Sequence, residues 1–313
     1  MTNHLTDKQW FPKPSADDFI MGMHANRKTD EVCMQPIDYR PELLPLPENT
    51  AVEVKADGLS FTWITGEAVT KTGLPFGRAA RPFHHELCRL EEYYRERMVF
   101  QAEYIHADGY EAAMASWKAG RDDGILIIFE AVPYLSWCGH IESPTLKLRR
   151  EFLEGFFKAA GPFQKLALAK HMTNFCAEGI ELGAGAAWDD EQEGLVVKDI
   201  TSPFVRGKSH HWMKVKKIIT DDLSVIGVIK GDGPWLHALI CLDGDKTVRV
   251  HPGFKDDQRC ELWANHAGTD LIGRVAEIKH TGRSKDGRIK SPSFFRWRDD
   301  KVTSAQQAKE TTN

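Results

Sequence analysis

The segment from Ala51 to Ser60, AVEVKADGLS, places a lysine just before a chain reversal. Lys55 ends a predicted strand, and Asp57-Gly58 directly after it is typical of a hairpin turn. An amine attacks phosphorus only when it is neutral, whereas an ordinary lysine has a pKa of about 10.4, so only ~0.1% is neutral at about pH 7.4. Making half of it neutral costs about 4 kcal/mol, which burial, neighbouring cations or magnesium can supply. Lys55 is therefore either a covalent nucleophile on a rigid strand end or a turn lysine exposed to water.

Further segments carry charged or aromatic side chains in patterns suited to a phosphorylated ligand. Each has an ordinary alternative when taken singly, such as a strand with charged ends, a half-buried basic strand, a core phenylalanine or a charged turn. Their order along the chain, after Lys55, is the informative feature. The segments are a strand containing Glu103, an apolar strand with Phe129-Glu130, EGLVVK from Glu193 to Lys198, WMKVK from Trp212 to Lys216, and RWRDDK from Arg296 to Lys301.

As an ordered set, these motifs resemble the covalent nucleotidyltransferases, and most closely the ATP-dependent DNA ligases of the short phage and bacterial kind. The resemblance runs from about Val52 to Lys301. It implies that Lys55 takes AMP from ATP as a phosphoramidate, that the AMP passes to the 5′-phosphate of a nick, and that the 3′-hydroxyl then seals the strand. It also implies Mg²⁺, which Mn²⁺ can replace, because phosphoryl transfer depends on positioning and charge neutralisation.

The resemblance assigns roles to individual residues. Phe129 would stack on adenine, and Glu53 would accept a hydrogen bond from its amino group. Glu193 would bind the metal, with Glu103 at the ribose hydroxyl or the metal. The remaining nucleotide contacts would be Lys71, Lys198, Lys214 and Lys216, the last two at the α-phosphate from a strand expected to neighbour Lys55, together with Arg298 and Lys301 at the departing pyrophosphate.

Two positions depart from the family pattern. The family usually has arginine where this chain has Ser60, and Arg78, Arg81 or Arg206 are possible substitutes. Lys71 stands where arginine is more common, and a lysine keeps the charge but loses the bidentate fork. We therefore expect nick sensing to be weaker or differently built.

The element pattern predicts an α+β fold in two domains, with antiparallel sheets and flanking helices in the first. Residues 1–48 are rich in proline and predict an extended arm or turns. Residues 49–220 would form the nucleotidyltransferase domain. Short strands and one helix in 221–302 predict a small β-barrel of oligonucleotide-binding type, and 303–313 a disordered tail. A functional hinge is expected near residue 220.

Composition narrows the remaining possibilities. No run approaches a membrane span and the N-terminus lacks a secretory core, so we expect a cytoplasmic protein, or a viral one acting in the host cytoplasm. Six scattered cysteines argue against disulfides and structural zinc, and the doublets His84-His85 and His210-His211 lack partners at ligand spacing. The net charge of −4 does not by itself indicate a nucleic-acid-binding protein. Basic residues nevertheless cluster toward the C-terminal end of the sequence, as in GRSKDGRIK at 282–290. That loop is equally a phosphate-contacting segment or a solvated hairpin.

The expected partner is nicked duplex DNA, bound by a monomer. Three alternatives stay open: a GTP-dependent capping-type enzyme, an RNA ligase, and a non-catalytic nucleic-acid-binding relative. Glu193 before Gly194, where the first two more often have Asp, favours DNA ligase modestly, and the presence of all the charged motif residues disfavours the third.

Overall fold

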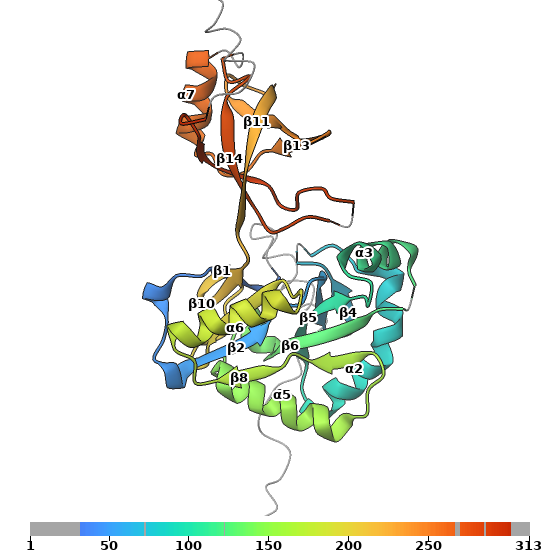
Figure 1. Cartoon of the computed structure of the whole chain (residues 1–313). Coiled ribbons are helices and arrows are strands. Elements are labelled where there is room, and N and C mark those ends of the chain that lie inside the picture. Colours follow the sequence, from blue (N-terminus) through green and yellow to red (C-terminus); the bar gives the residue numbers. More distant parts are fainter. Residues whose placement is uncertain (1–31, 72, 122, 267–269, 285, 302–313) are drawn as a thin grey trace, which may run out of the picture. The chain divides into compact units, whose positions relative to one another are not determined.

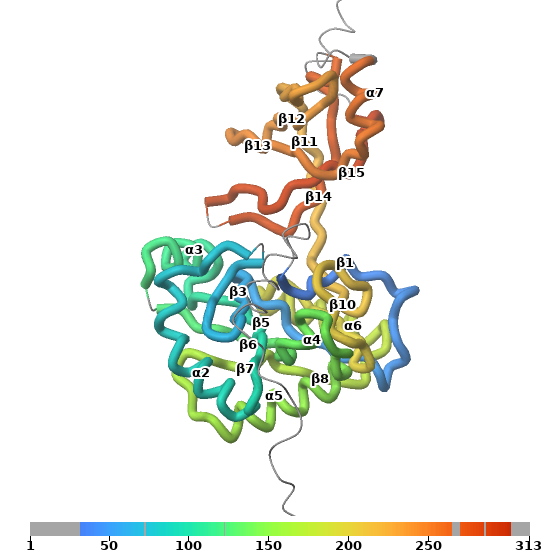
Figure 2. The backbone as a smooth tube through the Cα atoms, turned by 180° about the vertical axis from the view of Figure 1, so that it is seen from behind, coloured from blue at the N-terminus to red at the C-terminus, as the bar shows by residue number. Residues whose placement is uncertain are grey.

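The computed structural model describes residues 32–71, 73–121, 123–266, 270–284 and 286–301. The chain divides into two compact units (Figures 1 and 2). The boundary along the sequence lies between Val215 and Lys216, a few residues before the predicted one. Residues 1–31 of the predicted arm and the predicted tail at 303–313 lie outside the described residues.

The described part of the first unit contains two five-stranded sheets, with strand orders β1-β10-β9-β2-β8 and β4-β3-β5-β6-β7. The predicted α+β class is confirmed, although β1 with β10 and β6 with β7 pair in parallel, so the sheets are mixed. The strands are β1 (Met34–Asp38), β2 (Thr50–Val54), β3 (Leu59–Ile64), β4 (Glu67–Val69), β5 (Met98–Ile105), β6 (Ile125–Pro133), β7 (Leu166–Leu168), β8 (His171–Thr173), β9 (Gly194–Asp199) and β10 (Gly207–Lys216).

Helices α2 (Arg81–Tyr94) and α5 (Leu146–Ala160) pack on one of these sheets, and α6 (Ala177–Asp189) packs on the other. In α5, Thr145 caps the N-terminus by accepting a hydrogen bond from the Leu148 amide, and the helix ends just before Gly161-Pro162. The helices are η1 (Pro41–Leu43), η2 (Pro47–Asn49), η3 (Gly77–Ala80), α2 (Arg81–Tyr94), α3 (Tyr110–Ala119), α4 (Tyr134–Cys138), α5 (Leu146–Ala160) and α6 (Ala177–Asp189).

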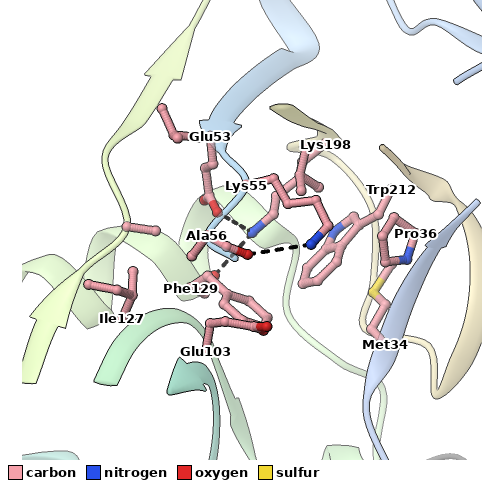
Figure 3. Close-up of a pocket in the computed structure, with 13 residues that line it drawn as sticks. Met34, Pro36, Glu53, Lys55, Ala56, Glu103, Ile127, Phe129, Lys198 and Trp212 are labelled. Atoms are coloured by element: carbon pink, nitrogen blue, oxygen red, sulfur yellow. Dashed lines mark hydrogen bonds and ion pairs between the residues drawn. The ribbon is translucent and has the colours of Figure 1, made fainter. Parts of the chain in front are cut away.

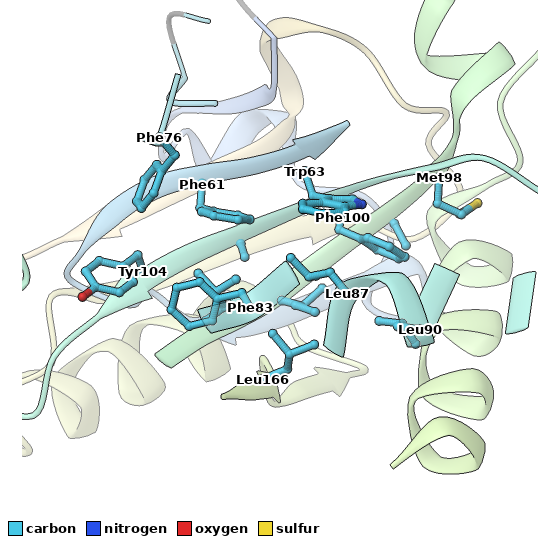
Figure 4. Close-up of a cluster of buried hydrophobic side chains, with 14 of the residues drawn as sticks. Phe61, Trp63, Phe76, Phe83, Leu87, Leu90, Met98, Phe100, Tyr104 and Leu166 are labelled. Atoms are coloured by element: carbon cyan, nitrogen blue, oxygen red, sulfur yellow. The ribbon is translucent and has the colours of Figure 1, made fainter. Parts of the chain in front are cut away.

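Three hydrophobic clusters hold the layers of the first unit together. The largest packs α2 and α5 against the β3-β5-β6 sheet through side chains such as Phe61, Phe83 and Phe100 (Figure 4). A second lies between the two sheets and joins Met34, Ile64 and Trp212 with their neighbours. The third packs α6 on the other face of the β2-β9 sheet. Each fully buried large apolar side chain contributes about 1.5–3 kcal/mol, so the sheets form a rigid support for the residues between them.

The segment predicted as an arm contributes a strand. Residues 34–38 form β1, which pairs in parallel with β10 at the edge of the first sheet. The prolines at positions 41 and 47 each begin a short 3-10 helix instead.

The second unit contains the strands β11 (Ile219–Lys230), β12 (Leu236–Asp243), β13 (Lys246–Val250), β14 (Val275–His280) and β15 (Ser293–Trp297), with one described helix, α7 (Asp256–His266). They form an antiparallel sheet of order β13-β12-β11-β14-β15 around its own core. The edge strands β13 and β15 do not pair with each other among the described residues. The predicted small β-barrel of oligonucleotide-binding type is therefore not confirmed.

Candidate active site

Lys55 lies one residue beyond β2, opposite the start of β9. Its backbone N–H donates to the Gly194 carbonyl at 2.9 Å, which continues the β2–β9 ladder and fixes the position of the residue. Its side chain is about one-fifth exposed, and Nζ lies 2.5 Å from Glu193 Oε2. The predicted nucleophile therefore stands on a rigid support beside a carboxylate.

Glu103 brings a second carboxylate to the same place from the other sheet. It lies on β5, directly opposite Ser60 of β3. Burial raises the pKa of Glu103 to about 7; the Lys55 ammonium opposes this, whereas the charge on Glu193 adds to it. Lys55 contacts Glu193 and lines one cavity with Glu103, so charged groups from both sheets meet at Lys55.

Behind Lys55, the two sheets line a cavity that is open to solvent (Figure 3). Its walls are largely apolar, with the charged groups at defined points. The lining residues are Met34, Pro36, Glu53, Val54, Lys55, Ala56, Glu103, Ile127, Phe129, Ala169, Val196, Lys198 and Trp212.

A buried ion pair forms one end of the cavity. Lys198 Nζ lies 2.7 Å from Glu53 Oε2 and donates to the Phe129 carbonyl at 3.1 Å, as Figure 3 shows. The same ammonium lies 4.1 Å from the centre of the Trp212 ring. Burial alone raises the pKa of Glu53, but Lys198, His171 and Arg150 together outweigh it and lower this pKa to about 2. Glu53 is therefore an ionised acceptor at neutral pH.

Aromatic side chains complete the cavity wall. The rings of Phe129 and Trp212 lie 6.0 Å apart, centre to centre, in an edge-to-face arrangement. Trp212 is 2% exposed, and its Nε1–H has no hydrogen-bond partner among the described residues. A buried donor without a partner in a cavity wall fits a ligand that carries acceptors.

Several predicted residues lie elsewhere. Lys214 and Lys216 are on β10, which β9 separates from β2, so the expectation that they neighbour Lys55 on the adjacent strand is wrong. Lys214 instead pairs with Asp38 at 3.1 Å, and Lys216 is the first residue of the second unit. Lys71 is exposed at the turn after β4 and does not line the cavity.

The three arginines considered as substitutes for the one missing at Ser60 do not line the cavity either. Arg78 lies in η3, Arg81 begins α2, and Arg206 stacks its guanidinium 5.0 Å from the centre of the Trp137 ring. Ser60 itself is half-buried on β3.

Arg298 and Lys301 belong to the second unit, where both contact Asp222. Arg298 Nη1 lies 2.8 Å and Lys301 Nζ 2.5 Å from Asp222 Oδ2. Arg298 also pairs with Asp300 at 2.7 Å. Their closure over a nucleotide stays a prediction.

The donor set beside Lys55 fits Mg²⁺ bound together with phosphate. Among the described residues, no group of three or more His, Cys, Asp or Glu side chains is placed to hold a metal ion. Glu193 contacts Lys55, and Glu103 lines the cavity together with Lys55. Mg²⁺ is commonly held by one or two carboxylates with substrate phosphates and water completing its shell.

The sequence did not indicate the contributions of Met34, Pro36 and His171. Met34 and Pro36 come from the segment predicted as an arm, and His171 reaches Glu53 through the pairing of β8 with β2. Only the strand order reveals these contacts. Trp212 belongs to one of the predicted motifs, but nothing in the sequence indicated that its side chain lines the cavity.

No protein-family model matches the sequence. A DNA ligase of Archaeoglobus fulgidus is 30% identical over 184 residues, a match that covers 50% of this chain and 33% of the relative. The chain therefore spans about a third of the length of that curated relative.

Solved structures of ligases share the fold over most of the chain. Pmar-Lig_PreS3 superposes with a TM-score of 0.70 and 19% identity, covering 85% of this chain and 67% of that one. A Lig E DNA ligase gives a TM-score of 0.65 and 15% identity, with 85% and 99% coverage. The ATP-dependent DNA ligase of bacteriophage T7, in complex with ATP, gives 0.51 and 14%, with 87% and 100% coverage.

The chain has the fold of the ATP-dependent DNA ligases. This confirms the resemblance drawn from the motifs, because the ligase structures match 85% of the chain. The sequence match to a DNA ligase supports it separately from the fold. None of the helices described in this ligase fold has the length and apolar character that crossing a bilayer requires.

Proposed function

We propose that the protein is an ATP-dependent DNA ligase that seals nicks with a 5′-phosphate and a 3′-hydroxyl in duplex DNA through an adenylyl-lysine on Lys55. The observation that carries this proposal is the placement of Lys55 beside Glu193, at a cavity whose walls hold Glu53, Phe129 and Glu103. The two carboxylates near Lys55 and the apolar walls match a nucleotide whose phosphates lie at the mouth and whose base lies inside.

In the first step, the Lys55 amine attacks the α-phosphorus of ATP. A P–N bond forms, the bond from the α-phosphorus to the bridging oxygen breaks, and pyrophosphate leaves. Lys55 must first lose a proton to solvent, because Glu193, 2.5 Å from Nζ, is the carboxylate assigned to the metal and a metal ligand stays deprotonated. The β2–β9 ladder holds the backbone of Lys55 still, so that little freedom is lost when the amine reaches the phosphorus.

Glu193 and Glu103 would hold Mg²⁺, which when bound neutralises charge on the phosphates. Glu53 would orient the adenine and Phe129 would lie against its ring. In the later steps, AMP moves from Lys55 to the 5′-phosphate, and attack by the 3′-hydroxyl releases AMP as the strand is joined. Such sealing would serve DNA replication, repair or recombination, by a monomer in the cytoplasm.

Covalent labelling tests the proposal directly. The protein is mixed with magnesium and ATP, GTP or NAD carrying label in the transferred phosphate, and adducts are separated on a denaturing gel. Wild type should be labelled by ATP, as should Lys158→Ala, which alters an exposed lysine on α5, whereas Lys55→Ala should not. The labelled protein should then seal a nicked duplex.

Each other outcome rejects the proposal in a defined way. Label from GTP would indicate a capping-type enzyme, and label from NAD a different cofactor. An ATP adduct that seals nicked RNA but not nicked DNA would indicate an RNA ligase. No adduct with any nucleotide would indicate a non-catalytic relative.

A further inference from the structure

Glu53 is held from both sides of its strand. It is 2% exposed on β2, which lies between β9 and β8. Lys198 of β9 contacts Oε2 at 2.7 Å, and His171 Nδ1 of β8 contacts Oε1 at 2.8 Å. Each carboxylate oxygen therefore has a fixed partner from a different neighbouring strand.

The contact to His171 is built into the sheet register. Glu53 and His171 are directly opposed in the antiparallel β2–β8 pair, and the His171 side chain is 8% exposed. A carboxylate only accepts hydrogen bonds, so Nδ1 carries the proton in this contact. Arg150, from α5, adds a positive charge with Nη1 3.8 Å from Oε1.

A carboxylate discriminates between purines by its position. Adenine presents an amino donor at position 6, and guanine presents a carbonyl acceptor there. Guanine, however, carries donors at the adjacent ring nitrogen and at its own amino group. A carboxylate that can slide along this edge accepts from either base, whereas one held opposite position 6 suits adenine.

We propose that His171 is a positioning residue: its Nδ1–H holds Glu53 in register with position 6 of the purine, so that the site selects adenine over guanine. This inference rests on the proposed function, because it concerns the nucleotide that modifies Lys55. His171 does not line the cavity and acts through Glu53. The positive charges around Glu53 keep it an acceptor, and the two strands fix where it accepts.

Two substitutions of His171 by amide residues distinguish its hydrogen bond to Glu53 from the packing of its side chain. The asparagine amide lies where Nδ1 of histidine lies, whereas the glutamine amide reaches toward the position of Nε2. His171→Asn should therefore retain the contact to Glu53, and His171→Gln should lose it. His280→Gln is a matched control, since His280 is a buried histidine that contacts Asp221 at 3.1 Å in the second unit.

The measurement is the rate of adduct formation by the full-length protein, as a function of ATP and of GTP concentration. His171→Gln should raise the half-saturating ATP concentration about tenfold and lower the ATP-to-GTP preference about tenfold, the effect of losing one hydrogen bond to a charged group. Its maximal rate with ATP should stay within about twofold, because the groups at Lys55 are unchanged. His171→Asn and His280→Gln should behave as wild type.

The inference is overturned if His171→Gln and His171→Asn behave alike, or if His171→Gln lowers only the maximal rate and leaves the preference intact. Either result would assign His171 a structural role. If wild type forms no adduct with ATP, the proposed function fails and the inference fails with it. An ATP adduct on wild type with an unchanged preference in His171→Gln rejects the inference alone.

Discussion

Two carboxylates of the site sit in opposite electrostatic surroundings. Glu103 is half-buried near Glu193 with only partial compensation from Lys55, and its pKa is raised to about 7. Glu53 is buried among positive groups, and its pKa is lowered to about 2. Because the two pKa values move in opposite directions from the ordinary value, the same Glu-to-Gln change should have opposite effects on stability.

Glu103→Gln should stabilise the protein above neutral pH. A carboxyl whose pKa is raised in the folded state contributes stability below about pH 4.5 that is lost as pH rises through about 7. In the absence of metal, the variant should therefore have a melting temperature several degrees above that of wild type at about pH 8, since each kcal/mol shifts it by roughly 2–4 °C. At about pH 4.5 the two proteins should melt at the same temperature. A variant that melts lower at the higher pH would contradict the raised pKa.

Glu53→Gln should destabilise the protein at neutral pH, by about 3–5 kcal/mol, because it leaves buried Lys198 without its counter-charge. The stability that ionised Glu53 contributes is present above about pH 4.5 and is lost as pH falls through about 2. Urea unfolding at a series of pH values should thus show the difference from wild type shrinking as pH falls below about 4.5. A difference independent of pH would contradict this assignment.

At the scale of residues, the sequence predicted well which residues belong to the site, but only part of the contacts between them. Lys55, Glu103 and Glu193 come together as expected, and so do Glu53, Phe129 and Lys198 at the cavity. The contact of His171 with Glu53 depends on which strands pair, and a single sequence does not contain that information. For the same reason Lys214 was placed one strand too near.

At the scale of elements, the turn between β2 and β3 depends on close approach to β5. A Cβ added at Gly58 would lie 2.2 Å from the Tyr104 carbonyl oxygen and 3.0 Å from Glu103 Cγ. A larger residue must therefore push this backbone away from β5, which changes the position of Lys55 relative to the Glu103 carboxylate.

Gly58→Ala should consequently lower stability by about 1–3 kcal/mol and slow adenylylation of Lys55. Gly155→Ala is the matched control, because Gly155 lies within helix α5 with no atom within 4 Å of the added Cβ. That control should gain about 0.5–1 kcal/mol from its helical position. Thermal melting and the labelling gel measure both effects, and a neutral Gly58→Ala would contradict the close packing of this turn.

The elements with strong periodicity were predictable, and those with weak patterns were not. Apolar β6 contains the strand predicted at Phe129-Glu130, and α2 and α5 are amphipathic, which is the pattern typical of a helix packed on a core. The alanine- and glycine-rich helix α6 and the short strand β1 were missed. Glycine lowers helix propensity, and a five-residue strand that includes a proline has little periodicity to detect.

At the scale of the whole molecule, the second unit carries Arg298 and Lys301, which the family resemblance assigns to the pyrophosphate that leaves in the first step. Replacing either by alanine should slow adduct formation with ATP about a hundredfold, the usual effect of removing a charged group that stabilises a phosphoryl transition state. Sealing of a nick that already carries AMP should remain within about twofold of wild type. An equal loss in both assays would show that these residues act on DNA or on folding of the second unit instead.

The central claim is that Lys55 carries the AMP. The most direct measurement is tandem mass spectrometry of peptides from protein incubated with ATP and magnesium, with the modified residue located by fragmentation. We expect a single phosphoramidate-linked AMP on Lys55, and none after brief treatment with acid, which cleaves the P–N bond. AMP on Lys198, Lys214 or any other lysine, with Lys55 unmodified, would contradict the account.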